Sequence, residues 1–266
     1  MLRTFINIFA FLLLTAIAFI MLFPVVLTFT ESVFESGFNS PLTARNFTDL
    51  LFTEFDLPVL FPRYFINSVI ITAVIVILQL WLTTPAAYAL AKLTFPGVKF
   101  LNTAVELGLF FGITGMGGLF TSQYIILNKM HLINTYPALI LPAVSAPLAV
   151  FLLRQFIKQI PDDLIHAARI DGVSHRKICR DIIIPNSRPA RITVVILAIS
   201  GSWQAGVYNF VYSEEMKTIS TVINKIGHEN TGVAFALSVV LTALPLGFYM
   251  LYHKNIAETL AFGELK

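Results

Sequence analysis

The sequence predicts an all-α, polytopic membrane protein with six transmembrane helices. Hydrophobic residues make up 56% of the 266 residues, charged residues only 12%, and the mean hydropathy is +0.78. With 24 phenylalanines, the chain has more apolar surface than a soluble domain of this length can bury. Several apolar runs also reach the roughly 20 residues that a helix needs to cross a bilayer. Because backbone groups in lipid must be hydrogen-bonded within their own segment, we expect helices rather than open sheets.

Six runs qualify as spans, and they cover residues 5–29, 65–91, 100–120, 136–153, 192–210 and 232–252. The first run is about twice as long as the apolar region of a signal peptide, and its A-x-A pattern at residues 16–18 lies inside the run rather than after it, so we expect it to be retained. No soluble insert is long enough to form a core of its own. We therefore expect one transmembrane domain over residues 1–266.

Lysine and arginine are unevenly distributed between the predicted loops. If the N-terminus is cytoplasmic, 13 of the 18 basic residues fall on the cytoplasmic side. Short loops rich in these residues remain in the cytoplasm. This bias predicts cytoplasmic N- and C-termini and a cytoplasmic segment between the fourth and fifth spans.

That cytoplasmic segment, residues 158–190, is the most charged part of the chain. Ten formal charges lie between Ile160 and Arg191. Pro161, Asp162 and Asp163 are typical of a helix start, because proline is tolerated in the first turn and carboxylates suit the positive end of the helix dipole. An apolar face is expected to follow from five residues: Leu164, Ile165, Ala167, Ala168 and Ile170.

The segment is expected to turn sharply after its first helix. Gly172 allows the turn, and Ser174 is placed to cap a second helix that runs through Ile182. The chain then returns toward the membrane at Pro185 and Pro189. Two short helices with small residues near the bend suit insertion into a cleft of a partner protein.

These residues carry a resemblance to a known family. The pattern P-x-x-L-x-x-A-A-x-I-D-G-x-S, followed by I-I-x-P-x-x-x-P, resembles the EAA loop of inner-membrane permease subunits of binding-protein-dependent ABC importers. It is most similar to carbohydrate-uptake permeases of the maltose-transporter type. Supporting stretches lie at residues 67–97, 133–143, 151–161 and 201–204, so that the likeness covers about residues 60–260.

The resemblance implies a type I ABC importer permease fold and a division of labour between subunits. In this family the loop forms a coupling helix that docks on a cytoplasmic ATPase. The implied coupling residues are Asp162, Asp163, His166, Ala167, Ala168, Asp171 and Gly172. The chain has no G-x-x-x-x-G-K-[ST] motif, so no cofactor is expected on it, and ATP and Mg are expected on the partner ATPase.

The implied partners are a second, homologous permease, two copies of the ATPase, an extracytoplasmic solute-binding protein and a carbohydrate. The implied location is the inner membrane of a bacterial or archaeal cell. One departure from the family pattern is His166, which stands where glutamate is usual. An imidazole does not make the same charge-assisted contact with a basic ATPase residue, so Asp162 or Asp163 takes that role or the partner has a matching change. His166 is alternatively a solvated loop residue without a role.

A polar transport pathway is expected to use amide, hydroxyl and aromatic groups, which hold sugars by hydrogen bonds and ring faces. The candidates are Gln79, Gln123, Tyr124, Trp203, Gln204, Tyr208 and Asn209. Each of them also suits an ordinary contact between helices. Glu106 is the only acidic residue within a predicted span, and its place near the cytoplasmic end favours a packing or gating pair. Pro137, Pro142 and Pro147 are expected to break or bend the fourth span.

Three alternatives to a carbohydrate importer remain open at this point. One is an ABC importer permease for another polar solute. A second, an ion-coupled secondary transporter, is disfavoured because the sequence shows no inverted repeat and only one intramembrane acid. The third, an intramembrane enzyme, lacks a catalytic constellation within the spans. Cys179 is the only cysteine and no H-E-x-x-H spacing occurs, so neither a disulfide nor a metal site is expected.

Overall fold

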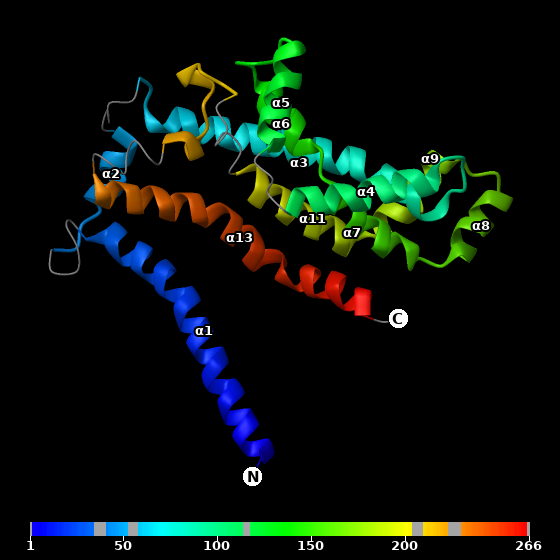
Figure 1. Ribbon diagram of the computed structural model, residues 1–266, viewed down its shortest axis with the longest axis horizontal. Coiled ribbons are helices and arrows are strands. Elements are labelled where there is room, and N and C mark those ends of the chain that lie inside the picture. The colour runs from blue at the N-terminus through cyan, green and yellow to red at the C-terminus, as the bar shows by residue number, and fades with distance from the viewer. Residues whose placement is uncertain are drawn as a thin grey trace. The chain divides into compact units, whose positions relative to one another are not determined.

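The computed structural model describes residues 2–34, 41–52, 58–113, 118–203, 210–222 and 230–264 (Figure 1). The described residues form no strand, and their one β contact is an isolated bridge between Phe34 and Leu42. The α-helices are α1 (Leu2–Val33), α2 (Arg45–Phe52), α3 (Phe61–Lys92), α4 (Val98–Ile113), α5 (Gly118–Lys129), α6 (Tyr136–Val144), α7 (Pro147–Lys158), α8 (Asp162–Ile170), α9 (His175–Ile178), α10 (Ile184–Asn186), α11 (Arg188–Ser202) and α13 (Thr231–Glu264). A π-helical turn, η1 (Cys179–Ile183), joins α9 to α10, and a 3₁₀ turn, η2 (Glu214–Met216), precedes α13. The all-α prediction is confirmed.

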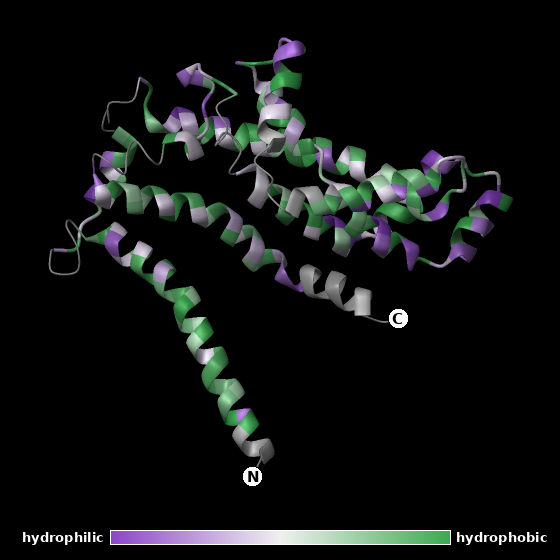
Figure 2. Ribbon diagram, viewed as in Figure 1, coloured by the Kyte–Doolittle hydropathy of each residue, from purple (hydrophilic) through white to green (hydrophobic). Residues whose placement is uncertain are grey.

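Four predicted spans coincide with helices that are long and apolar enough to cross a membrane. They are Ile6–Val33, Phe61–Lys92, Tyr136–Lys158 and Thr231–Lys254. Figure 2 shows hydrophobic residues along most of α1, whereas hydrophilic residues gather on α8. The sequence boundaries lie within a few residues of the ends of these candidate spans, although α13 continues to Glu264.

The third and fifth predicted spans are different. The run 100–120 falls on α4 and the start of α5, each shorter than 18 residues, and residues 114–117 between them lie outside the described part. The fifth run begins on α11, which follows the helix of residues 175–186 at a bend of 82°. The described residues therefore contain four candidate spans, or five if this bent pair is one span.

The fourth span is broken as its prolines predict. Helix α6 ends at Val144, Ser145 and Ala146 are not helical, and α7 begins at Pro147. Proline at the first position of α7 has no backbone N–H to lose, which makes it a suitable restart. Pro142 lies inside α6 without ending it.

The chain divides into two compact units. The first unit comprises Met1–Arg63 and Thr221–Leu244, and the second comprises Tyr64–Ser220 and Pro245–Lys266. The core of the second unit at the end of α3 contains Ala87, Leu153, Ile157 and Val194, from α3, α7 and α11. The predicted cytoplasmic segment adds its own apolar residues to this core: Ile160, Ile165, Ile178 and Ile183. The segment is thus packed onto the helices rather than free in solution.

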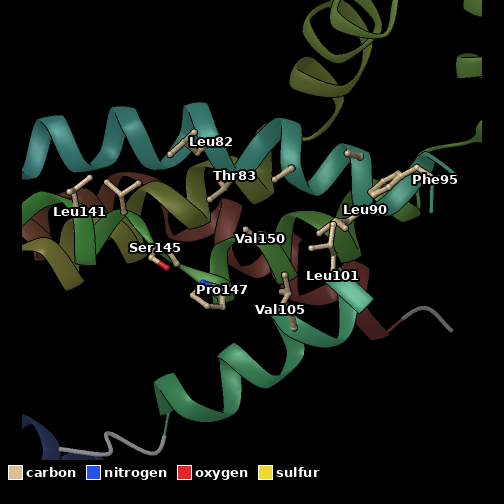
Figure 3. A pocket seen from close by; sticks show the side chains of 15 residues that line it. Leu82, Thr83, Leu90, Phe95, Leu101, Val105, Leu141, Ser145, Pro147 and Val150 are labelled. Atoms are coloured by element: carbon tan, nitrogen blue, oxygen red, sulfur yellow. The ribbon is translucent and has the colours of Figure 1, made fainter. Parts of the chain in front are cut away.

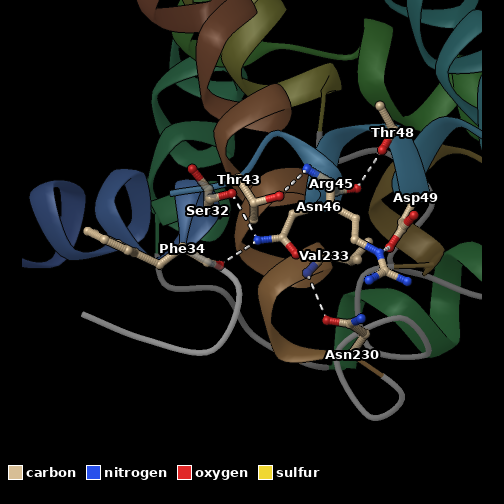
Figure 4. A network of polar contacts seen from close by, with 9 residues as sticks. All are labelled: Ser32, Phe34, Thr43, Arg45, Asn46, Thr48, Asp49, Asn230 and Val233. Atoms are coloured by element: carbon tan, nitrogen blue, oxygen red, sulfur yellow. Dashed lines mark hydrogen bonds and ion pairs between the residues drawn. The ribbon is translucent and has the colours of Figure 1, made fainter. Parts of the chain in front are cut away.

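In the first unit, Asn46 joins α2 to the end of α1 (Figure 4). Its side chain is buried, and Nδ2 donates hydrogen bonds to the carbonyl oxygens of Ser32 at 3.0 Å and Phe34 at 2.8 Å. These carbonyls lack partners within α1, because the last turn of a helix leaves its acceptors free. A Cβ atom added at Gly232, in the first turn of α13, would lie 2.7 Å from Asn46 Oδ1. Glycine at 232 therefore allows α13 to approach this amide.

We predict that Gly232→Ala lowers the thermal stability of the purified protein, because the new methyl group must displace the buried Asn46 amide from its two hydrogen bonds. The loss is expected to be about 1–3 kcal/mol, the usual range for disrupting such a buried polar group. Gly247→Ala in the same helix is the matched control, since its Cβ meets nothing within 4 Å. Scanning fluorimetry in detergent measures both. Equal melting temperatures for the two variants would contradict the role of Asn46.

Candidate functional site

Helix α8 has one buried side and one exposed side. Ile165 is buried in the core of the second unit and Ala168 packs against that core. The exposed side presents a row of residues spaced i, i+3, i+4 and i+7, which we call the outward face: Asp163, His166, Ala167 and Ile170. The prediction of a single apolar face is therefore wrong, because Ile165 and Ala168 point inward and the other apolar residues do not.

The outward face of α8 includes an unusual apolar residue. Ile170 is 87% exposed, and Leu164 at the margin of the face is 46% exposed. Burying an isoleucine or leucine side chain is worth about 1.5–3 kcal/mol. With Ala167 between Asp163 and Ile170, a partner backbone can approach the helix closely.

A glycine C-cap ends α8, as the sequence predicts. Gly172 has φ +74°, in the left-handed region that favours glycine. Its N–H donates to the Arg169 carbonyl at 3.0 Å, and the Val173 N–H donates to the Ala168 carbonyl at 2.9 Å. This pair of bonds is the Schellman motif. A Cβ at position 172 would meet nothing within 4 Å, so the backbone conformation rather than space requires glycine there.

The second predicted helix begins where expected and extends further. Ser174 occupies the N-cap position of α9, but its side chain makes no capping hydrogen bond, so that part of the prediction is wrong. The helix continues beyond Ile182 through η1 and α10 to Asn186. Single π-helical turns inside helices occur often at functional sites.

The start of α8 is held by Lys92, the last residue of α3. The Lys92 ammonium donates to the carbonyl oxygens of Lys158 at 3.1 Å and Ile160 at 2.6 Å, and to Asp162 Oδ1 at 2.7 Å. The Lys92 side chain is only 6% exposed, whereas that of Asp162 is 66% exposed. The first two bonds go to the last residue of α7 and to Ile160, two residues beyond it, and so help to end that helix.

The ion pair with Lys92 is present at neutral pH. The hydrogen bond from Lys92, followed by its charge, holds the pKa of the Asp162 carboxyl below its usual range. A carboxylate with a lowered pKa stabilises the fold above the ordinary carboxyl pKa, and this contribution is lost as the pH falls through the lowered value. The start of α9 has a matching contact, because the Tyr88 hydroxyl and His175 Nδ1 form a hydrogen bond at 3.1 Å.

Glu106 has a partner that the sequence did not reveal. Arg154 Nη1 on α7 lies 3.1 Å from Glu106 Oε1 on α4, and α4 packs along α7. The Arg154 side chain is 8% exposed and that of Glu106 is 53% exposed. Arg154 follows the fourth predicted span by one residue and is one of the 13 basic residues counted as cytoplasmic, but it lies buried on α7 within the candidate span Tyr136–Lys158. The pair fits the predicted packing or gating contact.

The pathway candidates that the structure describes lie on different helices. Gln79 is buried on α3, and Trp203 is buried at the end of α11 with its ring edge against Phe65. Tyr124 on α5 is exposed and lies beside Phe210. Within the described ranges, no hydrogen bond or ring contact joins Gln79, Tyr124 and Trp203 to each other. Gln123 is half-buried on α5, and Gln204, Tyr208 and Asn209 lie outside the described residues.

An exposed aromatic pair extends the predicted set. Tyr124 and Tyr212 share a hydrogen bond, which is the main cause that raises the pKa of Tyr212. Both rings are exposed, and Phe210 lies beside Tyr124. Nothing in the local sequence pointed to Tyr212, since only the fold brings it to α5.

Residues 212–219 are held by α3 and by the turn before α6. Asn134, with φ +63°, accepts backbone N–H bonds from Tyr212 and Ser213 through Oδ1. The other contacts come from the beginning of α3: Tyr64 to Glu214 Oε2 at 3.1 Å, Asn67 Nδ2 to the carbonyls of Glu215 at 2.6 Å and Lys217 at 3.0 Å, and the Ile219 N–H to Ser68 Oγ at 2.9 Å. We call residues 212–219 the tethered segment.

A cavity of about 690 Å³ lies between α3, α4, α6 and α7 (Figure 3). Its walls are mainly aliphatic, with Leu82, Leu90, Val105 and Val150 among them. Of the pathway candidates that the structure describes, none lines it. A carbohydrate needs convergent polar groups, so this cavity does not suit one. In the part of the chain that the structure describes, no group of three or more His, Cys, Asp or Glu residues is arranged to hold a metal ion.

The chain is similar to one family and to several proteins that are all described as membrane components of transport systems. The family model described as "binding-protein-dependent transport system inner membrane component" matches residues 76–254. An arabinooligosaccharides transport system permease protein of Halalkalibacterium halodurans is 33% identical over 235 residues, or 85% of this chain and 81% of that protein. A trehalose transport system permease protein of Mycobacterium tuberculosis is 30% identical and covers 78% of each chain. A trehalose/maltose transport system permease protein of Thermococcus litoralis is 29% identical, covering 94% of this chain and 93% of that protein.

Solved structures show the same fold. A chain of a bacterial ABC transporter involved in the import of the acidic polysaccharide alginate superposes with a TM-score of 0.77 at 19% identity, covering 94% of this chain and 96% of that chain. A bacterial alginate ABC transporter in complex with an alginate pentasaccharide-bound periplasmic protein gives a TM-score of 0.68 at 17% identity, covering 94% and 93%. The likeness to the first extends over nearly the whole of both chains.

We predict that Glu106→Gln destabilises the protein, because it leaves the buried Arg154 guanidinium without its charge partner. The expected loss is about 2 kcal/mol, below the range for a fully buried pair because Glu106 is half-exposed. The double variant Glu106→Gln, Arg154→Met is expected to recover part of that loss. A double-mutant cycle on thermal stability measures the coupling. Additive effects of the two substitutions would show that the pair does not interact.

Proposed function

The chain belongs to the family of binding-protein-dependent transport system inner membrane components, and on that premise we propose that it is the permease subunit of an ATP-driven carbohydrate importer. It provides half of the translocation pathway and is moved by a cytoplasmic ATPase that docks on residues 158–190. The outward face of α8, with the glycine turn that follows it, is the observation that carries this proposal.

The chemistry of this surface suits docking into a protein groove. Ile170 and Leu164 supply apolar area on a segment expected in the cytoplasm, where an exposed isoleucine gains by burial against a partner. Asp163 and Asp171 are exposed carboxylates available to basic groups of an ATPase. His166 is exposed on the same face, and we propose that it contacts the partner.

Carbohydrate is the proposed substrate class. Support comes from the relatives, whose names specify arabinooligosaccharides, trehalose and trehalose/maltose. The exposed Tyr124 and Tyr212 offer ring faces and hydroxyls of the kind that hold sugars. Another polar solute is the second candidate within the class. The ion-coupled secondary transporter and the intramembrane enzyme are set aside, because the family match spans residues 76–254.

The proposed assembly contains a second, homologous permease, two copies of the ATPase with ATP and Mg bound there, and an extracytoplasmic solute-binding protein. The binding-protein partner is supported by the alginate transporter solved with its periplasmic protein. We propose six spans in one transmembrane domain, with both termini cytoplasmic. The third span would combine α4 with the start of α5, and the fifth would include α11.

We predict that the chain, expressed with candidate ATPase, second-permease and binding-protein subunits from the same genome, copurifies with one of each kind after membrane extraction. In proteoliposomes the complex should accumulate a carbohydrate from a panel of mono- and oligosaccharides only when ATP is inside and binding protein outside. A stable complex that transports a non-carbohydrate solute would move the proposal to the second candidate. Absence of any associated ATPase would overturn it.

We predict that Gly172→Val abolishes uptake while the chain still inserts and assembles, because a β-branched residue resists the positive φ at 172. Gly172→Asn is the matched control, since asparagine enters the left-handed region more readily than other non-glycine residues. It should retain much of the wild-type uptake. Uptake and ATP hydrolysis are measured in the same vesicles for the wild type and both variants. Normal uptake by the valine variant would contradict a required turn at 172.

A further inference from the structure

We call residues 158–190 the coupling segment. We propose that α3 is a strut that transmits movement of the coupling segment to the tethered segment, residues 212–219, with Tyr88 and Lys92 as positioning residues at one end. The inference rests on the proposed docking of residues 158–190 on an ATPase. It adds a route for the movement that the family comparison and the sequence do not specify.

The coupling segment is continuous along the chain with α7 and α11 but not with α3. Movement of α8 and α9 reaches α7 through residues 159–161 and α11 through α10. Helix α3 is separated from the segment by 66 or more positions in the chain, so only non-covalent contacts can move it. Such contacts are present at the first residues of both α8 and α9, which are each hydrogen-bonded to α3.

Tyr88 and Lys92 provide the contacts at this end. They are four residues apart and therefore lie on one face of α3, where Lys92 holds the start of α8 and Tyr88 holds the start of α9. The Tyr88 side chain is buried and belongs to the same core cluster as Ile165 and Ile178. The Tyr88 and Lys92 side chains are buried although their partners His175 and Asp162 are exposed, so breaking either bond leaves a desolvated polar group on α3, which costs about 1–3 kcal/mol.

The opposite end of α3 is bonded in the same way. Asn67 and Ser68, both buried, bond the backbone at Glu215, Lys217 and Ile219, and Tyr64 bonds the side chain of Glu214. From Ser68 to Lys92 the helix rises about 36 Å at 1.5 Å per residue, which exceeds the thickness of a bilayer core. Pro85 removes one backbone hydrogen bond without ending the helix. One helix thus bonds the coupling segment on one side of the membrane and the tethered segment on the other.

The geometry has a direct consequence for the transport cycle. A displacement of the coupling segment pulls on the Lys92 and Tyr88 bonds and shifts or tilts α3, which carries the buried Gln79 and the bonds of the tethered segment with it. Without the Lys92 bonds, ATP hydrolysis should continue, but it should no longer be coupled to solute transport or stimulated by the loaded binding protein on the other side of the membrane.

The test uses the complete complex in proteoliposomes with Lys92→Met, which keeps the length of the side chain and removes its charge. Assembly and basal ATP hydrolysis should persist, while the solute transported per ATP and the stimulation by loaded binding protein each fall by about tenfold, a typical coupling between two sites. Lys92→Arg should restore most of both. Lys99→Met is the matched control, because Lys99 is an exposed lysine in the first turn of α4.

A second variant guards against a folding defect. Tyr88→Phe removes only the hydroxyl that bonds His175 and should lower the same ratio less strongly. If both ends of α3 act through the same strut, the effects of Asn67→Leu and Lys92→Met should not add. The double variant should then transport as much solute per ATP as the more severe of the two single variants. Ratios equal to the Lys99→Met control in both Lys92→Met and Tyr88→Phe would overturn the strut. If Lys92→Met fails to assemble, an unchanged ratio in Tyr88→Phe overturns it and a lowered ratio supports it.

Failure of the proposed function looks different. In that case the wild-type complex itself would show no associated ATPase and Gly172→Val would have no effect. A working wild-type importer in which Gly172→Val uncouples transport while the Tyr88 and Lys92 variants do not would leave the proposed function standing and remove the strut.

Discussion

The ammonium group of Lys92 is the interaction on which the attachment of the coupling segment to α3 depends. An ammonium removed from water must be met by oxygen acceptors, because an unpaired buried charge is strongly destabilising. Lys92 meets two carbonyl oxygens from the end of α7 and the carboxylate that starts α8. The same three bonds therefore end one helix, orient the next and attach both to α3. Ile165, Ile178 and Ile183 then complete an apolar core around this junction.

The inward side of the coupling segment stabilises the fold, and its outward side is available to a partner. Its inward side is satisfied by the core and by bonds to α3, so the segment has a defined shape before any partner is present. Its outward side keeps Ile170 and Ala167 exposed next to carboxylates. A preorganised surface loses less conformational entropy on docking, which favours tight coupling to a partner that moves.

Local features of the coupling segment could be predicted from sequence because they depend on neighbouring residues. Pro161 and the two aspartates begin α8, Gly172 adopts a positive φ, and the prolines of the fourth span coincide with its break. Features that depend on the fold could not. Arg154 gave no local sign that it pairs with Glu106 across α4 and α7, and Tyr88 and Lys92 read only as the end of an apolar helix. The apolar residues of α8 were assigned to one face because the sequence alone does not show that Ile165 is covered by core residues from other helices.

The most direct measurement is the distance between a spin label at Ala86 on α3 and one at Lys177 on α9, in a Cys179→Ser background of the assembled complex. Double electron–electron resonance would record it in the nucleotide-free and the ATP-trapped states, with a label on the second permease as a reference for movement. If α3 and the coupling segment move together, the distance between Ala86 and Lys177 stays unchanged while the distance from Lys177 to the reference changes. A change in the Ala86–Lys177 distance on ATP binding would show that α3 and the coupling segment move independently, which contradicts the strut.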